Sequence, residues 1–175
     1  HRLPNYNRKD STGICFIGER RFREFLSRYL PAQPGEIQQL DGTVIGQHQG
    51  LMYYTVGQRH GLGIGGPGEP WYVVGKDLEK SILFVVEGKN HPALFHSGLI
   101  AEDLHWISGK SPAPLSCTSR IRHRQDEQAC HLSELENGQL RVDFEQPQRA
   151  IAPGQSIVIY EGDLCLGGGI ISNAI

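Results

Sequence analysis

The sequence predicts a mainly β protein, with a small β-rich central domain that contains a short helix, followed by a six-stranded antiparallel β-barrel. Short runs of apolar and β-branched residues recur along most of the chain. Turn-forming residues lie between these runs, and the chain contains 22 glycines and 10 prolines. Short strands at near-regular spacing, separated by turn signals, are typical of closed antiparallel barrels.

The helix is predicted in RRFREFLSRYL (Arg20–Leu30). Its apolar residues follow the i, i+3, i+4, i+7 spacing that places side chains on one helical face. They are Phe22, Phe25, Leu26 and Tyr29. Pro31 ends the helix because proline cannot continue it. We interpret the aromatic stripe as part of a core rather than as a ligand site.

Residues 21–88 are predicted to form the central domain. The segment EIQQLDGTVIGQHQG has the pattern of a β-hairpin with Asp41–Gly42 as its turn. A third strand is predicted in LMYYTVGQ, and two more in WYVVGKDLEKSILFVVEG. The segment KNHPALFHSG is predicted to link this domain to the next one.

Residues 92–175 are predicted to form the barrel. The expected strands are LIAEDLHWIS, LSCTSRIRHR, QLRVDFEQP and SIVIYEGDLCLGGGIIS. Turns are expected at SGKSPAP, ENG and APGQ. In the closing strand, the glycines of CLGGGII indicate that backbones approach closely there.

Charge and hydropathy narrow the functional classes. The net charge of −2 gives no global sign of a nucleic-acid partner. Residues 1–30 carry seven Lys/Arg against three acidic residues, so a local anionic contact and a solvated basic end both fit. No apolar run approaches the about 18 residues of a membrane span, and there is no signal peptide. We therefore predict a cytoplasmic protein with no membrane partner.

The four cysteines are Cys15, Cys117, Cys130 and Cys165. In a chain without a secretory signal they are expected to be reduced thiols, and their spacing does not fit a zinc site, so no metal is predicted. Cys130 and Cys165 have apolar neighbours and are predicted to be inert core thiols. The chain starts with HRLPNYNRKD, without an initiator methionine, and we interpret it as part of a longer protein.

A glycine-rich segment, HGLGIGG, contains a formal G-x-G-x-x-G at Gly61, Gly63 and Gly66. A dinucleotide loop should open a helix, whereas PGEPW follows here, so a nucleotide site is disfavoured. The loop is expected to pass close to another group instead. Polar and aromatic residues near it could contact RNA or a neighbouring domain, or form ordinary surface. They are Tyr53, Tyr54, Gln58, Arg59 and His60.

The segment SRIRHRQ is the clearest basic cluster. On a regular strand, Arg120, Arg122 and Arg124 would share one face, with His123 on the other unless the strand bulges or ends there. A row of guanidinium groups suits phosphate oxygens. A solvated strand face that protects a sheet edge explains the same pattern, and spacing alone leaves both interpretations open.

The strongest chemical candidate is Cys15, in KDSTGICFIGER. A reactive thiolate needs nearby positive charge or a helix N-terminus, and Lys9 and Arg20 lie on either side with the predicted helix just downstream. Gly13 and Gly18 would let the segment change conformation.

Four segments together carry a resemblance that extends over essentially the whole chain. They are KDSTGICFIGERRFREFLSRYLPAQPGEI, HQGLMYYTVGQRHGLGIGG, WYVVGKD and CLGGGII. The chain resembles the C-terminal half of bacterial tRNA-specific 2-thiouridylases. The resemblance implies ATP-dependent sulfur transfer from a cysteine persulfide to C2 of the wobble uridine 34 in tRNAs for Lys, Glu and Gln. ATP would be bound by an N-terminal domain absent here, this part would bind no cofactor, and it would be inactive alone.

The resemblance also implies residue roles. Cys15 would carry the persulfide, in a segment (residues 1–20) that ends the catalytic domain. Arg122, His123 and Gln155 would contact tRNA, although the family has tyrosine more often where His123 stands. The barrel would resemble that of translation elongation factors. A cysteine desulfurase or a sulfur-relay protein would supply sulfur. The alternative is a non-catalytic RNA-binding β-barrel, in which Cys15 is a packing residue.

Overall fold

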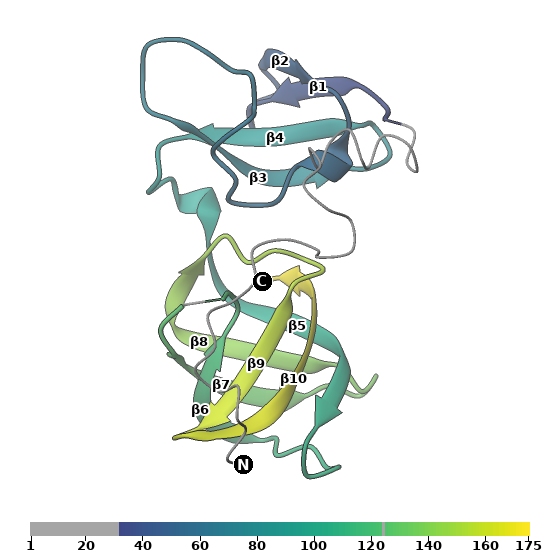
Figure 1. Ribbon diagram of the computed structural model, residues 1–175, viewed down its shortest axis with the longest axis vertical. Coiled ribbons are helices and arrows are strands. Elements are labelled where there is room, and N and C mark those ends of the chain that lie inside the picture. The colour runs from purple at the N-terminus through teal and green to yellow at the C-terminus, as the bar shows by residue number, and fades with distance from the viewer. Residues whose placement is uncertain (1–31, 124) are drawn as a thin grey trace, which may run out of the picture. The chain divides into compact units, whose positions relative to one another are not determined.

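The computed structural model describes residues 32–123 and 125–175, and Figure 1 shows their arrangement. The described residues form a four-stranded mixed sheet and a closed six-stranded antiparallel barrel, which confirms the predicted fold class. The predicted helix and Cys15 lie outside the described residues. No helix in the described part of the chain is long and apolar enough to cross a membrane.

The mixed sheet has the strand order β2-β1-β4-β3. Strands β1 and β4 are parallel, and the other two pairings are antiparallel. Two 3-10 helices, η1 and η2, accompany the sheet. The elements are β1 (Gly35–Gln38), β2 (Val44–His48), η1 (Leu51–Tyr53), β3 (Trp71–Asp77), β4 (Ile82–Glu87) and η2 (Pro92–Leu94).

The predicted hairpin is confirmed as β1 and β2, with a small shift in its turn. The amide of Gly42 donates to the carbonyl of Gln39 (3.0 Å), so the turn centres on Leu40 and Asp41. Gly42 follows with φ 87°, a left-handed conformation that glycine adopts without strain. The Asp41 carboxylate accepts from the amide of Thr43 (2.9 Å) and fixes the return of the chain.

The predicted third strand, LMYYTVGQ, is wrong. Residues 51–53 form η1, where the amide of Tyr54 donates to the carbonyl of Leu51 (3.3 Å). The side chains of Leu51, Tyr53 and Tyr54 all pack against the core of the mixed sheet. One helical turn brings neighbouring residues to the same side, whereas a strand would alternate them. Short apolar runs do not distinguish these two outcomes.

The barrel closes in the order β10-β5-β8-β7-β6-β9, and β9 pairs with β10 to complete the ring (Figure 1). All its pairings are antiparallel. The strands are β5 (Phe95–Trp106), β6 (Leu115–Arg120), β7 (Gln128–Glu134), β8 (Leu140–Arg149), β9 (Ser156–Glu161) and β10 (Leu164–Ala174).

Strand β7, QACHLSE, was not expected from the sequence, because its outward positions are polar. It buries Cys130 and Leu132 at alternate positions and exposes the neighbouring Ala129 and His131. Strand β6 ends at Arg120, four residues earlier than predicted. The expectation that Arg120, Arg122 and Arg124 share a strand face is therefore wrong: Arg122 lies in the turn after the strand, and Arg124 is outside the described residues.

Alternation of buried and exposed positions explains the barrel core. Strand β9 buries Ile157 and Ile159, which meet Leu99, Leu132 and Val142 of other strands. Burying such side chains stabilises the fold by about 1.5–3 kcal/mol each. In β10, a Cβ added at position 168 would clash with the carbonyl oxygen of the buried Ile157, so the predicted close approach of backbones is confirmed.

Candidate functional site

Three of the four residues that the resemblance selects line one hollow of the barrel surface. Arg122, His123 and Gln155 are far apart in the sequence but share a concavity of about 320 Å³, here called the basic concavity. Its lining residues are Arg120, Ile121, Arg122, His123, Gln155, Ser156, Val158 and Tyr160. None of them is acidic, so the surface favours an anionic ligand.

The turn that presents Arg122 and His123 is closed by Gln125. The Oε1 of Gln125 accepts from the amide of Ile121 (3.0 Å), and the Gln125 amide donates to the carbonyl of Arg122 (3.2 Å). The Nε2 of Gln125 donates to Oε1 of the buried Gln148 (2.9 Å), which anchors the turn to β8. The turn is therefore held at both ends, and sequence reasoning missed Gln125 because a lone glutamine carries no pattern.

Arg122 has a fixed position. Its Nη2 donates to the carbonyl oxygen of Ala150 (2.5 Å). Burial of the guanidinium, and then the charge of Arg149, lower the pKa of Arg122 from its ordinary value. An arginine has five N–H donors and stays protonated in proteins, so the bond to Ala150 leaves donors and a full charge for a ligand.

A second concavity, of about 420 Å³, adjoins the first and shares Ile121, Arg122 and Gln155 with it. The segment 55–58 and Ala152 complete its lining. Gly57 has φ 84°, and a Cβ added there would lie 2.6 Å from Ala150 Cβ and 3.3 Å from Arg122 Nη2. Glycine is therefore required for the close approach of this segment to Arg122. Of the residues that the sequence placed near the glycine-rich loop, Gln58 is the one that lines this concavity.

Gln155 is placed by a tight turn. The amide of Gln155 donates to the carbonyl of Ala152 (3.2 Å) across Pro153 and Gly154, and Gly154 has φ 81°. Proline followed by a left-handed glycine is the signature of a type II turn. Ile171 of β10 exchanges two further bonds with the turn, one with Gly154 and one with Gln155, each 2.8 Å. The APGQ segment is thus a rigid support for the Gln155 side chain.

Arg120 and Tyr160 also line the basic concavity. The guanidinium carbon of Arg120 lies 5.3 Å from the centre of the Tyr160 ring, a cation–π arrangement. Nη2 of Arg120 also contacts the Glu127 carboxylate (2.9 Å). Arg120 is therefore already neutralised, and we assign it a supporting role. Sequence reasoning missed Tyr160, whose strand shows only an ordinary alternation.

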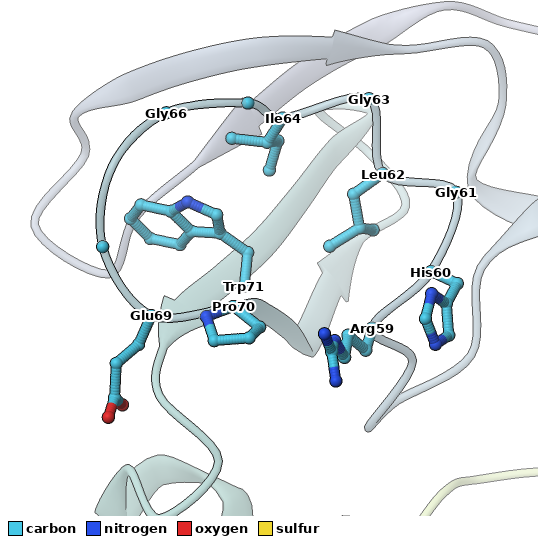
Figure 2. A pocket seen from close by; sticks show the side chains of 12 residues that line it. Arg59, His60, Gly61, Leu62, Gly63, Ile64, Gly66, Glu69, Pro70 and Trp71 are labelled. Atoms are coloured by element: carbon cyan, nitrogen blue, oxygen red, sulfur yellow. The ribbon is translucent and has the colours of Figure 1, made fainter.

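The glycine-rich loop does not fit a nucleotide site. It lines a concavity of about 310 Å³, but it leads into strand β3 rather than a helix. Figure 2 shows the loop curving around the side chains of Leu62, Ile64 and Trp71. Leu62 is buried, and the other two pack against the core of the mixed sheet. Because a strand and not a helix follows the loop, it offers no helix N-terminus at which phosphates could bind.

Cys15 lies outside the described residues. Cys130 is buried in the barrel core as expected, whereas Cys165 is partly exposed. Within residues 32–123 and 125–175, no three His, Cys, Asp or Glu side chains gather where they could hold a metal ion. In the part of the chain that the structure describes, the basic concavity offers a cationic side chain, Arg122, and an aromatic ring, Tyr160, in one lining. Such a lining suits recognition of an anion.

Comparison with known proteins identifies two domains and one family. Residues 23–87 match the family model described as tRNA methyl transferase PRC-barrel domain, and residues 96–171 match the aminomethyltransferase beta-barrel domain. Proteins named tRNA-specific 2-thiouridylase MnmA are close relatives. Those of Nitrosococcus oceani and Chromohalobacter salexigens are 58% and 55% identical over 98% of this chain. That of Nitrosomonas eutropha is 56% identical over 100% of it.

The match covers 48%, 46% and 50% of those three relatives, in the order named, so the chain spans about half the length of the curated relatives it matches. Within that span the identity exceeds one residue in two, and the match extends over both domains. The resemblance noted from the sequence is thereby confirmed. The chain belongs to the family of tRNA-specific 2-thiouridylases.

Proposed function

We propose that this chain supplies the tRNA-binding surface and the persulfide cysteine of a tRNA-uridine 2-sulfurtransferase. The reaction is ATP-dependent 2-thiolation of uridine 34 in tRNAs for Lys, Glu and Gln. The observation that carries the proposal is the gathering of Arg122, His123 and Gln155 in one concavity free of acidic residues. The names of the relatives, all tRNA-specific 2-thiouridylases, support the same substrate.

The basic concavity suits an RNA backbone. Arg122 offers a charged, pre-oriented guanidinium for phosphate oxygens, and Gln155 offers an amide that can both donate and accept. His123 adds a polar ring to the same lining, and Tyr160 adds an aromatic ring beside the Arg120 guanidinium. RNA recognition commonly combines phosphate contacts with contacts to such aromatic rings.

The proposed chemistry places Cys15 on the sulfur path. ATP activates the C2 oxygen of uridine, which makes AMP the leaving group. The terminal sulfur of the Cys15 persulfide attacks C2, and the C2–O bond to AMP breaks. A second thiol of the enzyme then attacks the Cys15 sulfur, so the S–S bond breaks and the sulfur remains on the base. The two cysteines end as a disulfide.

The proposal assigns roles along the chain. Residues 1–20 belong to the catalytic domain, residues 21–88 link and brace it, and residues 92–175 grip the tRNA. ATP is bound outside this chain. A cysteine desulfurase or a sulfur-relay protein delivers the persulfide, and the enzyme works in the cytoplasm, where such donors and tRNA are found together.

The binding half of the proposal is tested by tRNA titrations at several salt concentrations, with the full-length protein and its Arg122→Ala variant. Removing one cation that neutralises a phosphate should reduce the slope of log K against log salt by about 0.7–0.9. Arg141→Ala is the matched control, because Arg141 is paired with Asp143 (2.8 Å) on β8, outside the concavity. An Arg122→Ala slope equal to that of wild type would show that Arg122 contacts no phosphate.

A further inference from the structure

Two cysteines that the proposed function does not use face each other in the barrel wall. Cys117 of β6 pairs directly with Cys130 of β7 in the antiparallel register. Their sulfur atoms lie 3.8 Å apart. Directly opposed residues of antiparallel strands have Cα separations of about 4.5–5.5 Å, which falls within the range that disulfides span. The backbone of the barrel is thus already placed for an S–S bond.

The two thiols differ in their surroundings. Cys130 is 3% exposed, and its sulfur is 3.4 Å from the Ser119 hydroxyl. Cys117 is only partly buried and packs against the barrel core. The contact with the Cys117 sulfur, together with that of the Ser119 hydroxyl, lowers the pKa of Cys130 to about 7 against the opposing effect of burial. The same contact between the two sulfurs, with burial, raises the pKa of Cys117. Cys117 is therefore the more exposed member of the pair, and Cys130 is its buried partner with a lowered pKa.

We propose that Cys117 and Cys130 are a dithiol modification site, which a low-molecular-weight disulfide such as oxidised glutathione converts into a cross-strand disulfide. This inference is independent of the proposed sulfur transfer and involves neither Cys15 nor tRNA. It replaces the expectation that Cys130 is an inert core thiol with a chemical role for the pair.

The reaction balances in two exchange steps. The Cys130 thiolate first accepts the proton of the Cys117 thiol across the contact between the two sulfurs. The Cys117 sulfur then attacks one sulfur of oxidised glutathione; the glutathione S–S bond breaks, and one glutathione leaves as a thiolate that takes up this proton. The Cys130 sulfur then attacks the Cys117 sulfur, which expels the second glutathione. Two protein thiols are oxidised to one disulfide, one glutathione disulfide is reduced, and the two thiol protons leave on the two glutathiones.

The bond would fasten β6 to β7 three residues before Arg120, where β6 ends and the turn with Arg122 begins. It would close a loop of 12 intervening residues (118–129), which restricts the unfolded chain more than the folded one. Oxidation should therefore raise the melting temperature, by about 5–10 °C from the usual effect of a short-loop disulfide.

Peptide mapping tests the proposal directly. The full-length protein with Cys15→Ser, which removes the other candidate reactive thiol of residues 1–175, is treated with oxidised glutathione and quenched with acid. It is then alkylated and digested with trypsin without reductant. Trypsin cleaves after Arg120 and Arg124, so Cys117 and Cys130 fall in separate peptides, residues 111–120 and 125–141. We expect these two peptides to be recovered joined by a disulfide. Cys165, in residues 150–175, should carry the alkyl group and serves as the internal control.

A second variant and a second readout keep the test decisive. Cys117→Ser changes the partly exposed member of the pair and should still fold, but it should show neither the joined peptides nor the rise in melting temperature. Dithiothreitol should reverse both effects in the parent protein. The proposal would be overturned if the two peptides were recovered separately. Cys117 would then carry glutathione or the alkyl group, and Cys130 would be alkylated only after denaturation. An equal temperature rise in Cys117→Ser would also overturn the proposal.

Discussion

The guanidinium of Arg122 donates a hydrogen bond to the carbonyl oxygen of Ala150, 2.5 Å away. Ala150 is fully buried with φ 52°, and its own amide donates to the carbonyl of Leu94 (2.5 Å). Ala150 also packs in one apolar cluster with Leu94, Tyr72 and Val86. Arg122 is therefore tied to a rigid junction, and the side chain proposed to meet tRNA is oriented before tRNA arrives.

Arg122→Lys separates orientation from charge. Lysine keeps the positive charge but lacks the planar fork that reaches Ala150 and a phosphate together. We expect tRNA affinity to fall about 3- to 10-fold while the salt slope stays close to that of wild type. Titration at several salt concentrations measures both quantities. Wild-type affinity in this variant would mean that only the positive charge at position 122 contributes to tRNA binding. The hydrogen bond to Ala150 would then not orient the side chain for that contact.

Gly57→Ala tests the close approach of segment 55–58 to Arg122. The left-handed φ alone costs a non-glycine residue about 1–2 kcal/mol, and the added Cβ must also displace Ala150 or Arg122. Gly63→Ala is the matched control, because Gly63 has φ 71° and nothing within 4 Å of the added Cβ. We expect thermal denaturation to show a larger decrease in stability for Gly57→Ala, together with weaker tRNA binding. Equal effects of the two substitutions would mean that the close approach at Gly57 contributes to neither property.

Gln125→Ala should loosen the turn that carries Arg122 and His123. The amide of Ile121 loses its acceptor, a cost of about 1–3 kcal/mol where the group stays shielded from water. The expected result is reduced tRNA affinity with an unchanged salt slope, because no charge is removed. Gln139→Ala, in the turn between β7 and β8, is the control. If both variants bind tRNA like wild type, Gln125 does not position the site.

The ionisation of Cys130 gives a prediction in pH. A hydrogen bond from Cys117 stabilises the thiolate of Cys130, so its pKa lies at about 7, below the ordinary thiol value. Cys117→Ala removes that donor, and burial then acts to raise the pKa. Thiolate absorbance near 240 nm, measured in the Cys15→Ser background, should lose its transition near pH 7 in Cys117→Ala but keep it in Cys165→Ala. If the Cys15→Ser parent and its Cys117→Ala and Cys165→Ala derivatives all show the same transition near pH 7, the assigned hydrogen bond is contradicted.

Strands β8 and β9 alternate buried with less buried positions over most of their length and could be predicted from that pattern. Strands β3, β4, β5 and β10 alternate less regularly, and their apolar, β-branched runs between turn signals predicted them. Strand β7 was missed because Cys130 and Leu132 are its only buried apolar residues. The run from Leu51 to Tyr54 was misassigned because three-dimensional packing, rather than local pattern, decides between a strand and a helical turn.

The site was predictable only in part. Arg122, His123 and Gln155 were selected by resemblance, and the structure brings them to one concavity. The assumption of a regular strand through Arg122 failed because Gln125 closes a turn there, through hydrogen bonds that depend on Gln148 of a distant strand. Tyr160 and Gly57 reach the site through tertiary folding alone. Such residues carry no local signal, since their roles arise from partners far away in the sequence.

The proposal that this chain carries the sulfur used to modify tRNA depends above all on Cys15, and Cys15→Ser in the full-length protein is the decisive variant. The protein is given ATP, a persulfide donor and tRNA for Lys, Glu or Gln, and the digested tRNA is examined for 2-thiouridine by mass spectrometry. Cys165→Ser is the control and should form product normally. We expect no 2-thiouridine from Cys15→Ser while tRNA binding stays intact. Product at the wild-type rate would exclude Cys15 from the sulfur path and would leave the chain as an RNA-binding module without sulfur chemistry.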